Sequence, residues 1–107
     1  MDESTYNSRV ATAFKRISKA LDDTDPDLFD VVATPDMVTI VHLPSGERVI
    51  VNTQRVIKQI WVAGQGQGIH FHFHDPNWVD DKAKGLELFS WVSQCIQTLA
   101  PDLAVRI

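Results

Sequence analysis

Residues 51–74 alternate between apolar and polar side chains on either side of a glycine-rich turn, and this pattern requires a sheet that is buried on one face. Successive side chains of a strand point to opposite faces, so Ile60 and Val62 share one face and Trp61 lies on the other. After the turn, three apolar residues are opposed to three histidines: Ile69, Phe71 and Phe73 against His70, His72 and His74. We expect the apolar set to enter the core, which leaves Trp61 and the histidines on a solvent-side face typical of a recognition surface.

The remaining patterns predict two helices that flank a series of strands. Apolar residues recur every three or four positions from Tyr6 to Leu21, which predicts a helix over residues 4–22 that stops ahead of Pro26. A second amphipathic helix is predicted over residues 85–100, where Pro101 ends it. Strands are predicted at 29–34, 37–43, 47–52, 58–63, 68–74 and around Trp78.

This order of elements predicts an α+β fold. Short links between the strands favour antiparallel neighbours, and two helices with apolar stripes need a sheet face to cover. We therefore expect a two-layer α/β sandwich in which both helices pack on one face of an antiparallel sheet. The 107 residues are enough for one domain, 1–107, with residues 103–107 forming either a last strand or a coil.

Charge and composition exclude several classes of protein. The net charge of −4 argues against a nucleic-acid binder, which needs a basic footprint. No apolar run approaches the roughly 20 residues that cross a bilayer, so we expect no membrane partner. The first residues lack a hydrophobic signal region and an Arg-rich transit segment. The single cysteine, Cys95, cannot form an internal disulfide, which predicts a reducing, cytoplasmic location.

An acidic segment follows the first predicted helix. It holds five of the 14 acidic residues within ten positions: Asp22, Asp23, Asp25, Asp27 and Asp30. The dipole of the helix disfavours negative charge at its C-terminus by roughly 0.3–1 kcal/mol per group. Carboxylates are hard oxygen ligands for Mg, Ca, Mn and iron ions, and an exposed patch of them would bind metal weakly and with little selectivity. The alternative is that these aspartates are solvated turn formers.

Histidines and the cysteine are the other candidate site residues. His70, His72 and His74 lie about 7 Å apart along one strand face, so two neighbours could share a Zn, Ni, Co or Cu ion. The alternative is a polar strand face that happens to use histidine. His42 has the parity of the inward-facing strand residues, which predicts a structural role. Cys95 lies among apolar helix residues, which predicts a buried, inert thiol.

Several stretches of the chain together resemble the frataxin family, in particular its bacterial, CyaY-type members. They are Leu21-Asp22-Asp23 at the end of the first helix, Val51-Asn52-Thr53-Gln54, Lys58 to Ala63, Gly68-Ile69-His70-Phe71 and Trp78. The resemblance covers nearly the whole chain and implies an α/β sandwich of two helices on an antiparallel sheet. It also implies a protein that binds iron and regulates iron–sulfur cluster assembly.

The resemblance further implies partners and site residues. Members of the family bind the cysteine desulfurase and its scaffold protein, and they donate iron or modulate sulfur transfer. The implied cargo is weakly bound Fe²⁺ or Fe³⁺, with other divalent metals accepted, on an acidic ridge made of Asp22, Asp23, Asp25, Asp27 and Asp30. The implied partner-binding residue is Trp61, with Asn52, Gln54 and Gln59 as its neighbours. The residues themselves add His70, His72 and His74 as a secondary metal site.

The chain departs from the bacterial pattern just before the ridge. Relatives usually carry acidic residues there, whereas this sequence has Ser18 and Lys19, with Lys15 and Arg16 one turn earlier. We therefore expect a lower iron capacity and a weaker contact with a basic partner surface. Three functions stay open: a non-catalytic iron-binding regulator, which we favour, a ferroxidase that stores iron, and a protein-interaction module with incidental metal binding. We expect a monomer, with metal-driven oligomers as the alternative.

Overall fold

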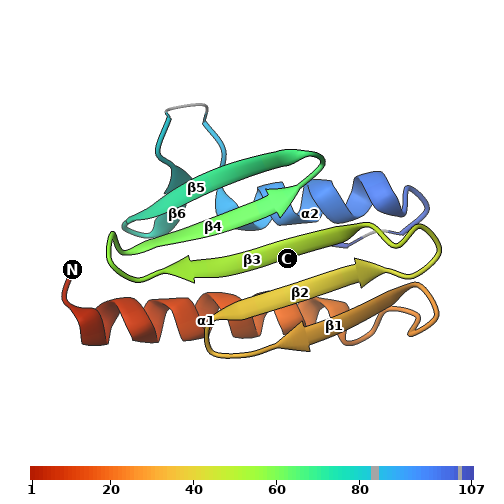
Figure 1. Cartoon of the computed structure of the whole chain (residues 1–107), viewed down its shortest axis with the longest axis horizontal. Helices are drawn as coiled ribbons and strands as arrows, with labels where there is room; N and C mark the ends of the chain where they lie inside the picture. The colour runs from red at the N-terminus through yellow and green to blue at the C-terminus, as the bar shows by residue number, and fades with distance from the viewer. Residues whose placement is uncertain (83–84, 104) are drawn as a thin grey trace.

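The computed structural model describes residues 1–82, 85–103 and 105–107. In chain order the elements are α1 (Glu3–Leu21), β1 (Phe29–Ala33), β2 (Met37–His42), β3 (Arg48–Gln54), β4 (Gln59–Gly64), β5 (Gln67–His74), β6 (Asn77–Asp80) and α2 (Leu88–Leu99). The strands form one antiparallel sheet in which each strand pairs with its sequence neighbours, and both helices lie on the same face (Figure 1). This arrangement confirms the predicted two-layer α+β sandwich.

Helix α1 begins and ends close to its predicted bounds. Its N-cap is Asp2, whose carboxylate accepts the N–H of Thr5 at 2.7 Å and so satisfies one of the donors that a helix start leaves unpaired. The helix ends at Leu21, one residue before the predicted end. Its buried face consists of the predicted apolar residues together with one alanine: Tyr6, Val10, Ala13, Phe14, Ile17 and Leu21.

The strands confirm the alternation predicted from the sequence. Ile60, Val62 and Phe71 are fully buried beneath the helices, whereas Trp61 lies on the opposite, solvent-side face. Strand β3 runs two residues beyond its predicted end because Gln54 pairs with the first residue of β4. Inward-facing and outward-facing side chains therefore alternate as far as Gln54, and the solvent-side face of the sheet extends to the β3–β4 turn.

Helix α2 begins at Leu88, three residues later than predicted, because the chain before it is extended. Glu87 forms an isolated antiparallel bridge with Val79 of β6, and its side chain then accepts the N–H groups of the first helical turn. The buried carboxylate of Asp80 accepts backbone N–H groups from the loop between β6 and α2. These contacts hold Leu86 and Glu87 in an extended conformation against the edge strand β6, so the helix begins only at Leu88.

Residues 103 and 105–107 form a coil, the second of the two alternatives left by the sequence. Val105 is buried against the core. Arg16 of α1 donates from Nη2 to the carbonyl of Ile107 at 2.8 Å, and the N–H of Ile107 donates to Ser93 Oγ at 3.2 Å. The coil therefore links the two helices.

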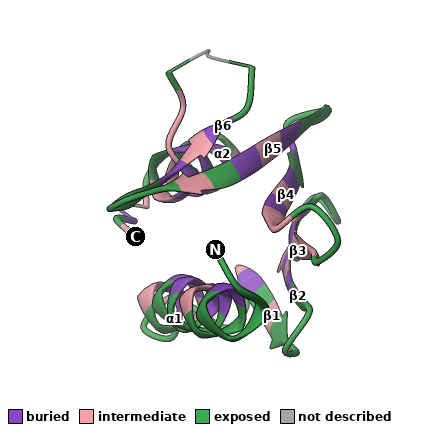
Figure 2. Ribbon diagram, turned by 90° about the vertical axis from the view of Figure 1, so that its left-hand side faces the viewer, coloured by how far each residue is buried: buried purple, intermediate pink, exposed green. Residues whose placement is uncertain are grey.

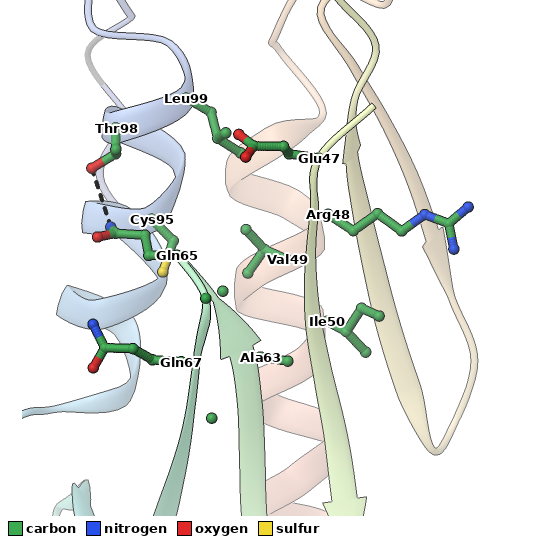
Figure 3. A pocket seen from close by; sticks show the side chains of 13 residues that line it. Glu47, Arg48, Val49, Ile50, Ala63, Gln65, Gln67, Cys95, Thr98 and Leu99 are labelled. Carbon is green, nitrogen blue, oxygen red and sulfur yellow. Dashed lines mark hydrogen bonds between the residues drawn. The ribbon is translucent and has the colours of Figure 1, made fainter. Parts of the chain in front are cut away.

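The turn between β4 and β5 packs against the end of α2. Its residues, Gln65 and Gly66, both have positive φ, 52° and 70°, which suits the twist of a two-residue hairpin. Gln65 Nε2 donates to Thr98 Oγ1 at 3.1 Å (Figure 3). The preceding residue, Gly64, lies so close to the helix that an added Cβ would be 2.9 Å from the Sγ atom of Cys95. A side chain at this position has no room.

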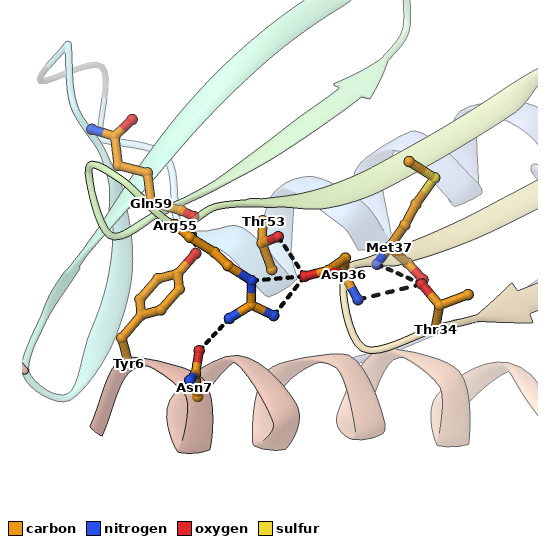
Figure 4. A network of polar contacts seen from close by, with 8 residues as sticks. All are labelled: Tyr6, Asn7, Thr34, Asp36, Met37, Thr53, Arg55 and Gln59. Carbon is orange, nitrogen blue, oxygen red and sulfur yellow. Dashed lines mark hydrogen bonds and ion pairs between the residues drawn. The ribbon is translucent and has the colours of Figure 1, made fainter. Parts of the chain in front are cut away.

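A polar network fixes the β3–β4 turn to α1 and to the β1–β2 turn. Arg55 Nε donates to Asp36 Oδ1 at 2.8 Å, and the same guanidinium donates to Asn7 of α1 (Figure 4). The hydrogen bonds from Arg55 lower the pKa of Asp36 below its usual range. The phenol of Tyr6 donates to the carbonyl of Gln59 at 2.6 Å, so the start of β4 is held by the helix as well.

The two helices cover different parts of the sheet. Helix α1 packs mainly on β1 and β2, and only its first turns reach β4, β5 and β6. Helix α2 packs mainly on β3, β4 and β6. Seen from the end, α1 lies below and α2 lies above with the β5–β6 hairpin (Figure 2). Neither helix in the described part of the chain is long and apolar enough to cross a membrane.

We expect Gly64→Ala to destabilise the protein by about 1–3 kcal/mol, because its Cβ would press on Cys95 in a packed core. Gly68→Ala is the matched control, since a Cβ there meets nothing within 4 Å. Urea unfolding midpoints of the two variants measure the difference. Cys95→Ala in the Gly64→Ala background should recover part of the loss, and equal midpoints for the two glycine variants would contradict the close approach.

Candidate functional site

The four predicted partner-binding residues lie together on the sheet face that the helices leave uncovered. Strand register places Asn52 opposite Trp61 and Gln54 opposite Gln59. The indole Nε1–H of Trp61 donates to Gln59 Oε1 at 2.9 Å, and Gln54 Nε2 donates to Asn52 Oδ1 at 3.3 Å. The structure therefore surrounds one large aromatic side chain with three amides that can donate and accept hydrogen bonds.

His70 belongs to the same group of residues. It lies opposite Trp61 on β5, and the two rings stack with centroids 4.0 Å apart and planes 6° apart. His70 Nδ1 is 3.7 Å from Asp81 Oδ2, and Gln59 Nε2 donates to the same oxygen at 3.4 Å. The indole is thus held by a stacked ring on one side and by a bonded amide on another. We call Asn52, Gln54, Gln59, Trp61 and His70 the Trp61 face.

The contact between Trp61 and His70 was not predicted, although the sequence contains a signal for it. A two-residue turn pairs residues that are equally distant from it, and Trp61 and His70 are equally distant from Gln65-Gly66. Strand alternation alone groups His70 with the next two histidines of its strand. Asp81, which lies beyond β6 in the sequence, had no local signal.

The histidine row lies on the outer face as expected, but its members differ in environment. His70 is half-buried against Trp61, whereas His72 and His74 are exposed. His72 lies opposite Gln59 and His74 opposite Asn77. Within residues 1–82, 85–103 and 105–107, no group of three or more His, Cys, Asp or Glu side chains is placed to hold one metal ion.

Exposed apolar side chains extend the outer face beyond the Trp61 face. Met37 of β2 lies opposite Asn52 and is 40% exposed, and Val32 of β1 is 55% exposed. Both alternate with inward-facing residues of their strands, so their exposure follows from strand parity. The uncovered sheet face therefore has apolar as well as polar area next to Trp61.

All five carboxylates of the acidic segment are exposed. Asp22 is the C-cap of α1, and Asp30 lies on the outer face of β1, opposite Val41. Three strand spacings separate β1 from the strand that carries Trp61, which is roughly 14 Å across the sheet. The acidic segment therefore borders the same outer face without reaching the Trp61 face.

One of the five aspartates has a structural role in the turn. Asp25 Oδ1 accepts the N–H of Asp27 at 2.8 Å, and the Asp25 carbonyl accepts the N–H groups of Leu28 and Phe29. The turn-former alternative therefore applies to Asp25. In the described part of the chain, the carboxylates of the other four receive no hydrogen bond from the protein, and no three of them lie close enough together to hold one metal ion.

His42 and Cys95 have the structural roles expected of them. His42 is buried, with Nδ1 2.7 Å from Ser45 Oγ and its ring 5.3 Å from that of Phe29. Cys95 is fully buried beside a cleft of about 640 Å³ between β3, the β4–β5 turn and the end of α2 (Figure 3). Burial raises the pKa of its thiol to about 11, which suppresses the reactive thiolate.

The chain is similar to known proteins over most of its length. The profile of the family described as "Frataxin-like domain" matches residues 1–102. An "Iron-sulfur cluster assembly protein CyaY" from Paraburkholderia xenovorans is 34% identical over 94 residues, which are 88% of this chain and 87% of that protein. A protein of the same name from Dechloromonas aromatica is 35% identical over 92 residues, 84% and 87% of the two chains.

A solved structure shares the fold. It is a frataxin from Psychromonas ingrahamii, studied as a model of stability modulation within the CyaY protein family. Its TM-score to this chain is 0.86 at 19% sequence identity, and the match covers 98% of this chain and 97% of that one. At this identity the likeness concerns the fold alone.

We expect native Cys95 to react with a thiol reagent at pH 8 more than a hundredfold slower than free cysteine, because a pKa of about 11 leaves about one thiolate in a thousand. Full labelling should appear when the protein is unfolded in guanidinium. The rate with Ellman's reagent in the two conditions measures this. Rapid labelling of the native protein would show that the thiol is accessible and ionised.

Proposed function

The chain belongs to the frataxin-like family, and on that premise we propose that it is a non-catalytic, iron-binding regulator of iron–sulfur cluster assembly. In this proposal it docks on the cysteine desulfurase and the scaffold protein, and it donates iron or modulates sulfur transfer. The relatives described above are named as assembly proteins, which supports the pathway. The whole chain acts as one domain in the cytoplasm.

The observation that carries the proposal is the immobilised Trp61 on an uncovered sheet face. Large aromatic residues account for much of the binding energy of protein interfaces. Because the Trp61 ring is already stacked on His70 and bonded to Gln59, docking would cost little further side-chain entropy. The amides around it can supply directional hydrogen bonds, and Met37 adds apolar area.

The acidic segment supports the metal-binding part of the proposal. Its four unbonded carboxylates are hard oxygen donors, which suit iron as a cargo that must be released again. Their exposure to water keeps the affinity low and sensitive to ionic strength. Lys19, in the last turn of α1, lies close in sequence to Asp22 and offsets part of the local charge.

The two surfaces adjoin closely enough for one partner to contact both. A basic patch on the partner would be attracted to the acidic segment, while the Trp61 face supplies the aromatic contact. Iron bound at the acidic segment would neutralise charge there and so weaken the electrostatic part of docking. Iron loading and partner affinity are then linked through the same carboxylates.

A second candidate function is a pure interaction module in which metal binding is incidental. The turn role of Asp25 favours it, because this carboxylate is already occupied by the N–H of Asp27. Both candidates use the same two surfaces. They differ in whether iron changes the affinity for the partner.

We expect Trp61→Ala to weaken binding to purified cysteine desulfurase about tenfold or more, because it removes the aromatic contact. Its Fe(II) affinity should stay unchanged, because the carboxylates are remote from the ring. A variant that combines Asp22→Asn, Asp23→Asn, Asp27→Asn and Asp30→Asn should behave in the opposite way, with weaker Fe(II) binding and a flatter salt dependence of docking. Anaerobic calorimetry and interferometry at low and high salt measure both quantities.

The combined variant keeps Asp25 so that the turn stays intact. Val56→Ala is the matched control for Trp61→Ala, because it removes an apolar side chain that is 96% exposed on the β3–β4 turn. Loss of Fe(II) binding in Trp61→Ala would contradict the assignment of iron to the acidic segment. A desulfurase affinity that does not change with salt concentration would contradict the electrostatic role of that segment. If the wild-type protein binds the desulfurase with the same affinity with and without iron, the pure interaction module is favoured.

A further inference from the structure

Helix α1 carries four cations along one side, although the chain has a net charge of −4. At about 100° per residue, Arg9, Lys15, Arg16 and Lys19 fall within roughly a third of the helix circumference. By the same angle Arg9 and Arg16 border the buried face, while the two lysines point further into solvent. The arginines therefore lie where α1 meets the rest of the molecule.

Both arginines are held in place by phenylalanine rings. Arg9 Cζ lies 4.0 Å from the ring centroid of Phe73 at the end of β5. Arg16 Cζ lies 3.9 Å from the ring centroid of Phe89 at the start of α2. Stacking of this kind fixes the plane of a guanidinium and leaves its edge free to donate hydrogen bonds.

The two guanidiniums line one cleft of about 340 Å³ between α1, the β5–β6 hairpin and α2. In Figure 2, α1 lies in the lower part of the view, and the β5–β6 hairpin and α2 lie in the upper part. The helix also contributes Ser8 and Thr12 to the lining of the cleft, and the opposite wall includes Pro76. The cleft thus combines two oriented cations with apolar and aromatic walls, and it lies on the helix side of the sheet, away from the Trp61 face.

Most of the donors of these arginines are unused. Arg9 has no ion-pair partner and makes no hydrogen bond in the described part of the chain. Arg16 uses one of its five N–H groups on the carbonyl of Ile107. Asp75 also lines the cleft, and its negative charge opposes an anionic ligand without pairing with either arginine.

We propose that this cleft binds an extended acidic peptide segment of a partner protein, with one carboxylate on Arg9 and another on Arg16. Seven positions of helix separate the arginines by about 10 Å along the axis. Three residues of an extended chain in the polyproline II conformation span about 9 Å and bring the side chain back to the same face. The matching ligand is an acidic residue, two residues that contact the aromatic walls, and a second acidic residue. Each carboxylate can accept two parallel hydrogen bonds from a guanidinium.

Charge argues for a peptide over the other polyanions. Nucleic acids and anionic membranes bind proteins through broad basic surfaces. This protein has a net negative charge, and the two oriented arginines are the only cations among the described residues that line its cleft. A peptide can place single carboxylates at a chosen spacing and fill the apolar wall between them. The site would let this protein hold a second partner while its sheet face is occupied.

The test uses the full chain and the probe peptide acetyl-Gly-Asp-Ile-Tyr-Asp-Gly-amide, with affinity and contact residues followed by NMR. The proposal expects shifts centred on the Nε–H signals of Arg9 and Arg16, and no binding of the same peptide with both aspartates replaced by asparagine. Combined Arg9→Gln and Arg16→Gln should weaken binding about tenfold or more, because both paired guanidiniums are lost. Combined Lys15→Gln and Lys19→Gln removes the same charge from the same helix outside the cleft and should cost less than about threefold.

A gain of affinity provides an independent readout that leaves both arginines unchanged. Asp75→Asn should tighten peptide binding by about two- to threefold, because it removes a like charge from the cleft wall. Equal losses in the arginine and lysine variants would show diffuse attraction and overturn the proposal. So would an absence of binding by the wild-type chain, or tighter binding to anionic vesicles or single-stranded DNA than to the peptide.

Discussion

The structure depends on burying one face of a continuous six-stranded sheet beneath two helices. Val38, Ile40, Val51, Ile60 and Val62 are each fully buried on that face, and burial of such a side chain is worth about 1.5–3 kcal/mol. A shift of register by one residue would exchange the two faces of a strand, so the core fixes what the opposite face presents. Trp61 therefore reaches solvent because its sequence neighbours are needed inside.

The two sides of the sheet carry different chemistry as a result. The outer face holds the stacked and hydrogen-bonded Trp61 near exposed Met37 and Val32, and the acidic segment lies at its β1 edge. The helix side holds the two stacked arginines of α1. In the proposed function the outer face serves cluster assembly. The arginine cleft would be free for another partner at the same time.

Local periodicity predicted the features that depend on one segment at a time. Helix α1, the faces of β4 and β5, and the burial of Cys95 and His42 all follow from spacing and polarity within a few residues. Features that depend on distant segments were missed or only partly seen. The stack of His70 on Trp61 follows from hairpin register, the late start of α2 follows from a bridge to β6, and the turn role of Asp25 follows from a side-chain bond.

We propose that iron binds at the acidic segment, and that the Trp61 face supplies the aromatic contact to the partner without binding iron. The most direct test is an anaerobic titration of the ¹⁵N-labelled chain with Fe(II), in which paramagnetic broadening of each amide reports its distance from the ion. We predict that broadening begins at residues 22–30, while the Trp61 indole N–H stays sharp. Broadening that begins at His70, His72 and His74 and includes the Trp61 indole would contradict it.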